Sequence, residues 1–86
     1  MEFTAIDVTY AELHEKLKRV KNGMTLTEVR QTFGGEEFKH ESGDEGEVSF
    51  WRFRVLDAAN TSDPHEIYMG TFADGKLSFG SILPRG

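Results

Sequence analysis

The sequence predicts an α+β fold with two layers, in which two N-terminal helices pack on one face of a three- to four-stranded antiparallel sheet. Up to Gly34, apolar residues recur at helical spacing behind two helix-start signals. After Gly35, apolar and polar residues alternate with the period of two that is typical of strands. A length of 86 residues is enough for one small core. We therefore expect a single domain over residues 1–86.

Both helices are predicted to begin at a capping box, in which a Thr side chain accepts from the N3 amide and a Glu reaches back. The first box is Thr9 to Glu12 and the second is Thr25 to Glu28. The apolar positions that follow the first box are Tyr10, Leu13, Leu17 and Val20. We expect helices at about 10–21 and 26–33. Asn22–Gly23 and Gly34–Gly35 should end them, because these residues adopt left-handed conformations readily.

Strands are expected at about 37–41, 48–56, 66–72 and 76–83, with a loop over residues 58–65. In the longest strand, Trp51, Phe53 and Val55 share one face. Phe50, Arg52 and Arg54 share the other. We expect the Trp51 face to be buried, because two arginines favour the solvent side.

Two registers compete for the last hairpin. A two-residue turn at Asp74–Gly75 would pair Phe72 with Leu77, Gly70 with Phe79 and Tyr68 with Ser81. Tyr68, Phe72, Leu77 and Phe79 would then be buried. The open face would show Ile67, Met69, Thr71, Ser78, Gly80 and Ile82. A three-residue loop would instead bury Ile67, Met69, Leu77 and Phe79. The first register is favoured, because it gathers the larger aromatic side chains in the core.

The charge of the chain is concentrated in one segment. The net charge is −5, and residues 36–47 contain six acids and one base. The six acids are Glu36, Glu37, Glu41, Asp44, Glu45 and Glu47. A nucleic-acid-binding protein needs a net basic face, so this balance argues against that class. We expect the acidic turn to orient a basic protein partner.

Targeting signals are not evident in this sequence. There is no Cys, which excludes disulfides, thiolate zinc sites and a lipidated cysteine within it. No stretch has the roughly 20 apolar residues of a membrane span. We expect a cytoplasmic protein for the sequence as written, and a cell-envelope or secreted one if a targeting segment precedes Met1.

Catalytic and metal-binding patterns are weak. His14, His40 and His65 lie in different predicted elements, without the spacing of a metal site. Neither a Ser elbow nor a phosphate loop is present, and the carboxylates cluster where solvent is expected. We therefore expect no catalytic residues, no cofactor and no metal.

The stretch from Val20 to Gly34 contains Gly23, Met24, Thr25, Glu28 and Val29. With Gly34 these residues resemble the signature of the SmpA/OmlA (BamE-like) outer-membrane lipoprotein family and of the β-lactamase inhibitor protein-like domains. Trp51–Phe53 and Tyr68–Leu77 resemble an aromatic strand and a hairpin of those families, in the same order. The resemblance implies the β-lactamase inhibitor-like fold. It also implies that the exposed sheet face and adjoining loops bind other proteins.

From these observations we predict a non-enzymatic protein-interaction module without a bound cofactor. The predicted contact residues are Phe50, Arg52, Arg54, Ile67, Met69, Asp44 and Glu45. Two alternatives remain open. One is a small-ligand or enzymatic domain with a pocket between the sheet and the first helix. The other is a structural domain that associates with itself, so we expect a monomer or a weak homodimer.

Overall fold

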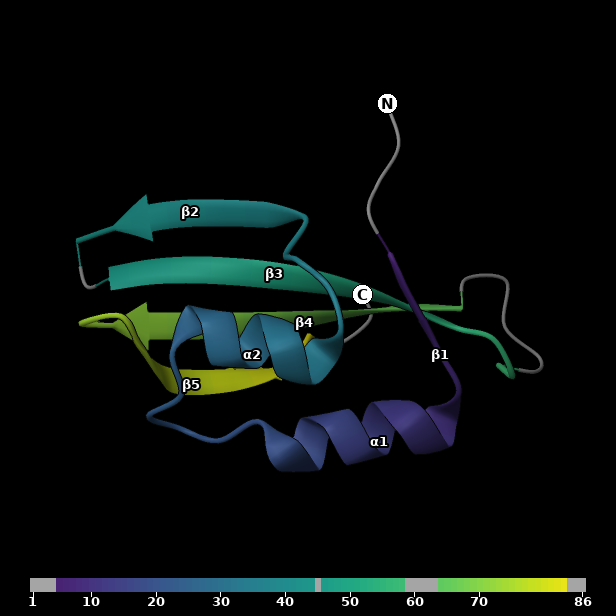
Figure 1. Ribbon diagram of the computed structural model, residues 1–86. Helices are drawn as coiled ribbons and strands as arrows, with labels where there is room; N and C mark the ends of the chain where they lie inside the picture. The colour runs from purple at the N-terminus through teal and green to yellow at the C-terminus, as the bar shows by residue number, and fades with distance from the viewer. Residues whose placement is uncertain (1–4, 45, 59–63, 84–86) are drawn as a thin grey trace.

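The computed structural model describes residues 5–44, 46–58 and 64–83, which form two helices and five strands (Figure 1). Their bounds are β1 Ile6–Val8, α1 Tyr10–Arg19, α2 Leu26–Phe33, β2 Lys39–Gly43, β3 Gly46–Val55, β4 His65–Ala73 and β5 Lys76–Ile82. Most of the loop expected over residues 58–65 lies outside the described residues. Within them, neither helix is long and apolar enough to cross a membrane.

The sheet confirms the α+β class but is mixed rather than antiparallel throughout. β3 lies at its centre and pairs antiparallel with β4, which pairs antiparallel with β5. On its other side, β3 pairs antiparallel with β2 near one end and parallel with β1 near the other. The four expected antiparallel strands are present as β2 to β5, but the parallel strand β1 was not expected. Three residues are too few to show a strand period in the sequence.

Both predicted capping boxes are present at the helix starts. The Thr9 hydroxyl accepts from Glu12 N, and Glu12 Oε1 accepts from Thr9 N at 2.9 Å. Thr25 and Glu28 repeat this arrangement for α2. α2 ends at Gly34 in the left-handed conformation, as predicted. α1 ends earlier than predicted, at Arg19, because its C-cap Val20 is already extended.

The core lies between the helices and one face of the sheet, with Phe33 of α2 at its centre. The Phe33 ring meets the rings of Trp51, Phe53 and Tyr68 edge to face, at centroid distances of 5.2, 5.1 and 4.9 Å. All four residues are buried, as are Val8, Leu13, Val29, Val55, Phe72 and Leu77. Trp51, Phe53 and Val55 thus occupy the predicted core face. Edge-to-face aromatic contacts add to the area that these large side chains bury.

The last hairpin follows the favoured register at its turn. It departs from that register between Phe72 and Thr71 of β4. Asp74 and Gly75 both have positive φ, as a two-residue turn of type I′ requires, and Phe72 pairs with Leu77. A β-bulge then places Thr71 opposite Phe79. Gly70 pairs with Gly80, not with Phe79, and Tyr68 pairs with Ile82, not with Ser81. The three-residue loop is wrong as well, because Met69 pairs with Ser81.

The bulge exchanges the faces of the residues that follow it. Phe79, predicted to be buried, turns to the open face and is 57% exposed. Gly80 and Ile82, predicted on the open face, lie on the core side with their partners Gly70 and Tyr68. A Cβ atom on Gly80 would overlap the Tyr68 hydroxyl, so the Tyr68 side chain crosses the bare backbone there. Position 80 of β5 must therefore be a glycine, because any side chain there would collide with Tyr68.

Candidate functional site: the open face of the sheet

Four of the predicted contact residues lie together on the sheet face opposite the helices. Phe50 of β3 pairs with Met69 of β4, and Arg52 pairs with Ile67. Alternation along each strand turns these side chains away from Trp51 and Tyr68, which are buried. In Figure 1, α1 and α2 both lie on the other side of the sheet. No described helix or strand covers this face, which we call the open face.

The open face extends to β2 and β5 through residues that the sequence did not identify. Phe79 faces the same side as its partner Thr71. Lys39 of β2 pairs with Phe50, and its Nζ lies 5.5 Å from the centre of the Phe50 ring. This cation–π contact sets a positive charge beside an aromatic side chain. The sequence signal for Lys39 was its place in a predicted edge strand, whereas Phe79 had none because the bulge decides its face.

Arg54 also turns to this side but is held by an ion pair. Its Nη2 lies 2.8 Å from Asp7 Oδ2, and the two residues are paired across β1 and β3. Both side chains are about half exposed, so water and salt weaken the attraction. The pair places Arg54 at the end of the open face, next to β1. Its guanidinium is oriented by Asp7 rather than by the apolar residues.

The acidic turn lies between β2 and β3, at the far end of the open face from β1. Asp44 is exposed and lines a hollow with Gly43, Gly46, Val48 and Thr71. Glu45 lies outside the described residues. Gly46 has φ 133°, and a Cβ atom there would overlap the Phe72 carbonyl oxygen. The turn is therefore anchored to β4 by a close backbone approach that only glycine permits.

A polar network that the sequence did not predict lies where β2 and β3 approach α2. His40 Nδ1 lies 2.8 Å from Ser49 Oγ, and its Nε2 lies 3.2 Å from Glu47 Oε1. The order Ser, His, Glu is that of a hydrolase relay. Ser49 is fully buried, however, so a substrate carbonyl cannot reach its hydroxyl in this arrangement. The network instead gives a buried hydroxyl its hydrogen-bond partner.

The same region contains an ion pair that is joined by two hydrogen bonds. Arg30 of α2 holds Glu37 through two hydrogen bonds, from Nε at 2.8 Å and from Nη2 at 2.9 Å. Burial of Glu37 is the largest single influence on its pKa and raises it. The hydrogen bonds and charge of Arg30, a backbone hydrogen bond and the nearby His40 together outweigh burial, so the pKa of Glu37 lies below its ordinary value. The hydrogen bond to Glu37 likewise raises the pKa of Arg30. This pair fastens α2 to the chain that enters β2.

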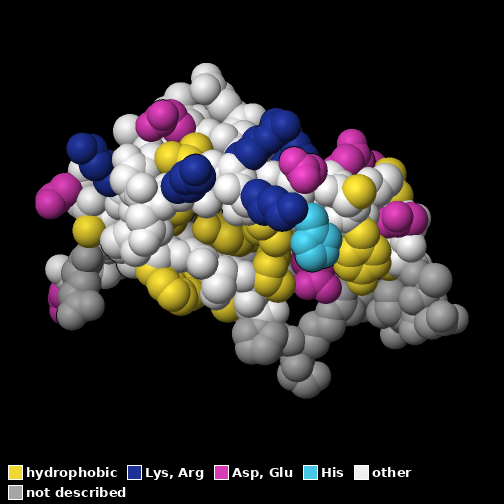
Figure 2. Space-filling model, turned by 90° about the horizontal axis from the view of Figure 1, so that it is seen from below, with side chains coloured by type: hydrophobic (Ala, Val, Ile, Leu, Met, Phe, Trp, Pro, Cys, Tyr) yellow, Lys and Arg dark blue, Asp and Glu magenta, His cyan; other side chains and the backbone are white. Residues whose placement is uncertain are grey.

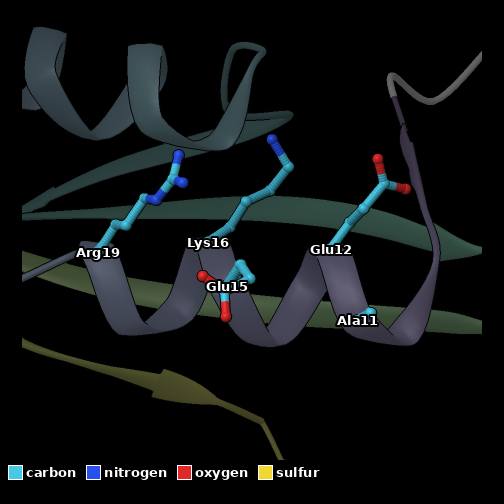
Figure 3. Close-up of a pocket in the computed structure, with 5 residues that line it drawn as sticks. All are labelled: Ala11, Glu12, Glu15, Lys16 and Arg19. Carbon is cyan, nitrogen blue, oxygen red and sulfur yellow. The ribbon is translucent and has the colours of Figure 1, made fainter.

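A second hollow, of about 350 Å³, lies along α1 (Figure 3). It is lined by Ala11, Glu12, Glu15, Lys16 and Arg19. Glu12 is engaged in the α1 cap, and Lys16 Nζ lies 3.4 Å from the Thr32 carbonyl oxygen at the end of α2. Glu12 and Lys16 thus stabilise helix ends, and no buried carboxylate or His lines this hollow.

Comparisons with known proteins do not identify a relative. No protein-family model matches the chain, and no curated protein or solved structure matches it significantly. Within the described ranges, no three His, Asp or Glu side chains gather closely enough to hold a metal ion.

Proposed function

We propose that this protein is a non-enzymatic protein-interaction module that binds a partner through the open face. The observation that supports the proposal most is the cross-strand group of Phe50, Met69, Arg52 and Ile67. It joins two aliphatic side chains, an aromatic ring and a guanidinium on a face that no described element covers. Aromatic and Arg side chains are enriched among residues that dominate protein interfaces.

The shape and surroundings of the open face support the same proposal. Its side chains lie on the two central strands, whose other face is covered by the aromatic core. Arg54 and Lys39 add positive charges at its borders, and Asp44 adds a negative one. Such mixed charges at the rim steer association and select partners more than they add affinity.

The sequence resemblance to the SmpA/OmlA and β-lactamase inhibitor protein-like families supports it further. In those families the exposed sheet face and adjoining loops bind other proteins, and we propose the same use and the same fold type here. The parallel strand β1 is an addition to the antiparallel sheet that the resemblance implies.

A double variant tests the proposal directly. Phe50→Ala with Arg52→Ala should keep the cooperative thermal unfolding of the parent, because neither residue belongs to the buried core. It should lose the proteins that the parent captures from a lysate of its source. Each truncated anchor is expected to cost about tenfold in affinity.

The matched control removes the same two side-chain types elsewhere. Tyr10 is 46% exposed and lies on α1 with Arg19, so Tyr10→Ala with Arg19→Ala deletes an exposed aromatic residue and an Arg away from the open face. This control should capture the same proteins as the parent. Equal capture by both double variants would show that the open face is not the binding site. A mass measurement at high concentration separates capture of a partner from homodimer formation.

A further inference from the structure

The open face continues past Phe50 and Met69 toward the β2–β3 turn. The next pair on this face is Val48 with Thr71, two residues further along each strand. Both residues line a hollow of about 460 Å³, which we call the turn hollow. Pairs on one face are spaced by two residues, so the turn hollow begins about 7 Å from the Phe50–Met69 pair. A partner seated on the open face therefore reaches it without leaving the sheet. The other lining residues are Gly43, Asp44 and Gly46.

The turn hollow exists because part of its lining has no side chains. Gly43 and Gly46 are paired across β2 and β3, and neither has a Cβ atom. Gly46 has to be a glycine, because a Cβ atom there would overlap the backbone of β4. On β4 the lining residue is Thr71, whose side chain is short. The remaining walls differ in chemistry, since Val48 is apolar and Asp44 is charged.

Asp44 gives the turn hollow a negative charge that the described residues do not compensate. Elsewhere on the open face, charges are paired: Lys39 Nζ lies 3.6 Å from Glu41 Oε1, and Arg54 Nη2 lies 2.8 Å from Asp7 Oδ2. Asp44 is exposed and makes no ion pair or hydrogen bond with any residue that the structure describes. A cationic side chain is therefore the group that complements it.

The cation of the neighbouring β4–β5 turn acts on the helix side instead. Lys76 forms an isolated β-bridge with Thr25, the N-cap of α2. The pKa of Glu28 lies below its ordinary value, chiefly through hydrogen bonds with Thr25 and also through the charge of Lys76. In Figure 2, which is seen from below, the visible Lys and Arg side chains lie in the upper half, on the side of the helices. Hydrophobic side chains reach the lower margin, on the side away from the helices.

We propose that the partner of the open face places a Lys or Arg side chain in the turn hollow and an apolar side chain on Phe50 and Met69. The inference rests on the proposed function and names the chemistry of the surface that the open face binds. The alkyl stem of the Lys or Arg would lie along Val48 and Thr71, and its charged end would reach Asp44. The two partner residues would stand about 7 Å apart, as residues i and i+2 do in a strand and residues i and i+4 do in a helix.

Selection from a displayed library of random twelve-residue peptides tests this proposal. The selected peptides should have Lys or Arg at one of these two spacings from a large apolar residue. The best peptide is then titrated into the ¹⁵N-labelled protein, and its affinity should fall with salt because Asp44 is exposed. The largest shifts should occur at amides of both parts of the surface, which are Gly43, Gly46, Thr71, Phe50 and Met69.

Two matched variants test the charge. Asp44→Asn keeps the shape of the side chain and removes its charge, so peptide affinity should fall about two- to fivefold at low salt. Asp74→Asn makes the same change in the β4–β5 turn, where Asp74 has a positive φ that Asn also adopts. This control should bind the peptide like the parent.

A change in the peptide shows whether its cation and Asp44 meet. Norleucine in place of the selected Lys or Arg keeps an alkyl stem and removes the charge. The norleucine peptide should bind the parent about two- to fivefold more weakly than the selected peptide does. It should also bind the parent and Asp44→Asn equally, because no charge remains for Asp44 to attract. A cation that binds elsewhere on the protein would not produce this equality.

A third variant fills the turn hollow. Gly43 does not have a positive φ, and an added Cβ atom would meet only the Gly46 carbonyl oxygen, at an ordinary contact distance of 3.7 Å. Gly43→Leu should therefore unfold cooperatively like the parent in a thermal scan. It should weaken peptide binding about tenfold or more, because the leucine occupies the space of the partner side chain.

Three results would overturn the proposal. The first is a selection that yields no peptide, or only peptides without Lys and Arg. The second is equal affinity of the best peptide for the parent, Asp44→Asn and Gly43→Leu. The third is a chain that sediments as a dimer and releases the turn-hollow amides on dilution, which would assign the open face to a second copy.

Capture experiments distinguish a failure of this inference from a failure of the proposed function. If Phe50→Ala with Arg52→Ala loses the captured proteins while Asp44→Asn and Gly43→Leu retain them, the open face binds its partner without the turn hollow. Only the present inference then fails. If the Phe50→Ala, Arg52→Ala variant also retains them, both proposals fail.

Discussion

The two faces of the sheet are built from alternate residues of the same strands, yet they differ completely in what covers them. On β3, Trp51 and Phe53 are fully buried beneath α2, whereas Phe50 and Arg52 on the other face are partly exposed. Both faces include aromatic residues, so composition does not explain the difference. The position of Phe33 explains the difference, because this α2 side chain covers the rings of Trp51 and Phe53 on one face of the sheet only. Stability should therefore depend on the covered face, and the open face should tolerate change.

The largest test of this contrast compares two phenylalanines. Phe33→Ala removes a fully buried ring that touches three others, and should lower the free energy of unfolding by about 3 to 5 kcal/mol. Phe79→Ala removes a ring of the same size that is 57% exposed, and should cost less than about 1 kcal/mol. Urea denaturation of the two variants and the parent measures both values. If both variants lost a similar free energy of unfolding, the Phe79 ring would have to be buried, and the open face would not be open.

Local sequence signals were sufficient for much of this architecture. The two capping boxes depend on residues three apart, so Thr9 with Glu12 and Thr25 with Glu28 predict the helix starts without tertiary information. The core face of β3 was predictable because arginines alternate with Trp51 and Phe53. The grouping of Phe50 with Ile67 and Met69 followed from the same alternation, once the favoured register of the hairpin was chosen.

The features that could not be predicted depend on contacts distant in sequence. β1 exists because Ile6–Val8 pair with Phe53–Val55, and three residues carry no period of their own. The bulge of β5 accompanies the crossing of Tyr68 over Gly80, a contact between neighbouring strands. The Arg30–Glu37 ion pair joins a helix to the chain after its C-cap, and neither residue belongs to a recognisable motif.

A second test uses pH to measure how much the Arg30–Glu37 ion pair on the covered side stabilises the fold. Glu37→Gln removes the carboxylate that Arg30 binds twice, and should cost about 1 to 2 kcal/mol at pH 7, since Arg30 is partly exposed. The folded pKa of Glu37 lies below its unfolded value of about 4.3. The stabilisation is thus present above that pH and is lost as pH falls through the folded pKa.

The parent and the Glu37→Gln variant should accordingly converge in stability as pH falls through the folded pKa of Glu37. The Thr25 hydrogen bonds lower the pKa of Glu28 in both proteins, so each loses some stability in acid and only their difference reports on Glu37. Urea denaturation at pH 7, 5 and 3.5 measures this difference. A constant difference across the three pH values would mean that the loss comes from packing rather than from the charge.

The smallest expected effect is that of the ion pair on the open face. Asp7→Asn leaves Arg54 without its carboxylate, but both side chains are about half exposed, so the cost should be below about 0.5 kcal/mol. That small difference should disappear in 1 M salt, where screening acts over only about 3 Å. Urea denaturation of parent and variant in low and high salt measures it. A loss above about 1 kcal/mol that salt does not reduce would show that Arg54 is shielded from water, and the open face would then not be freely accessible at its β1 end.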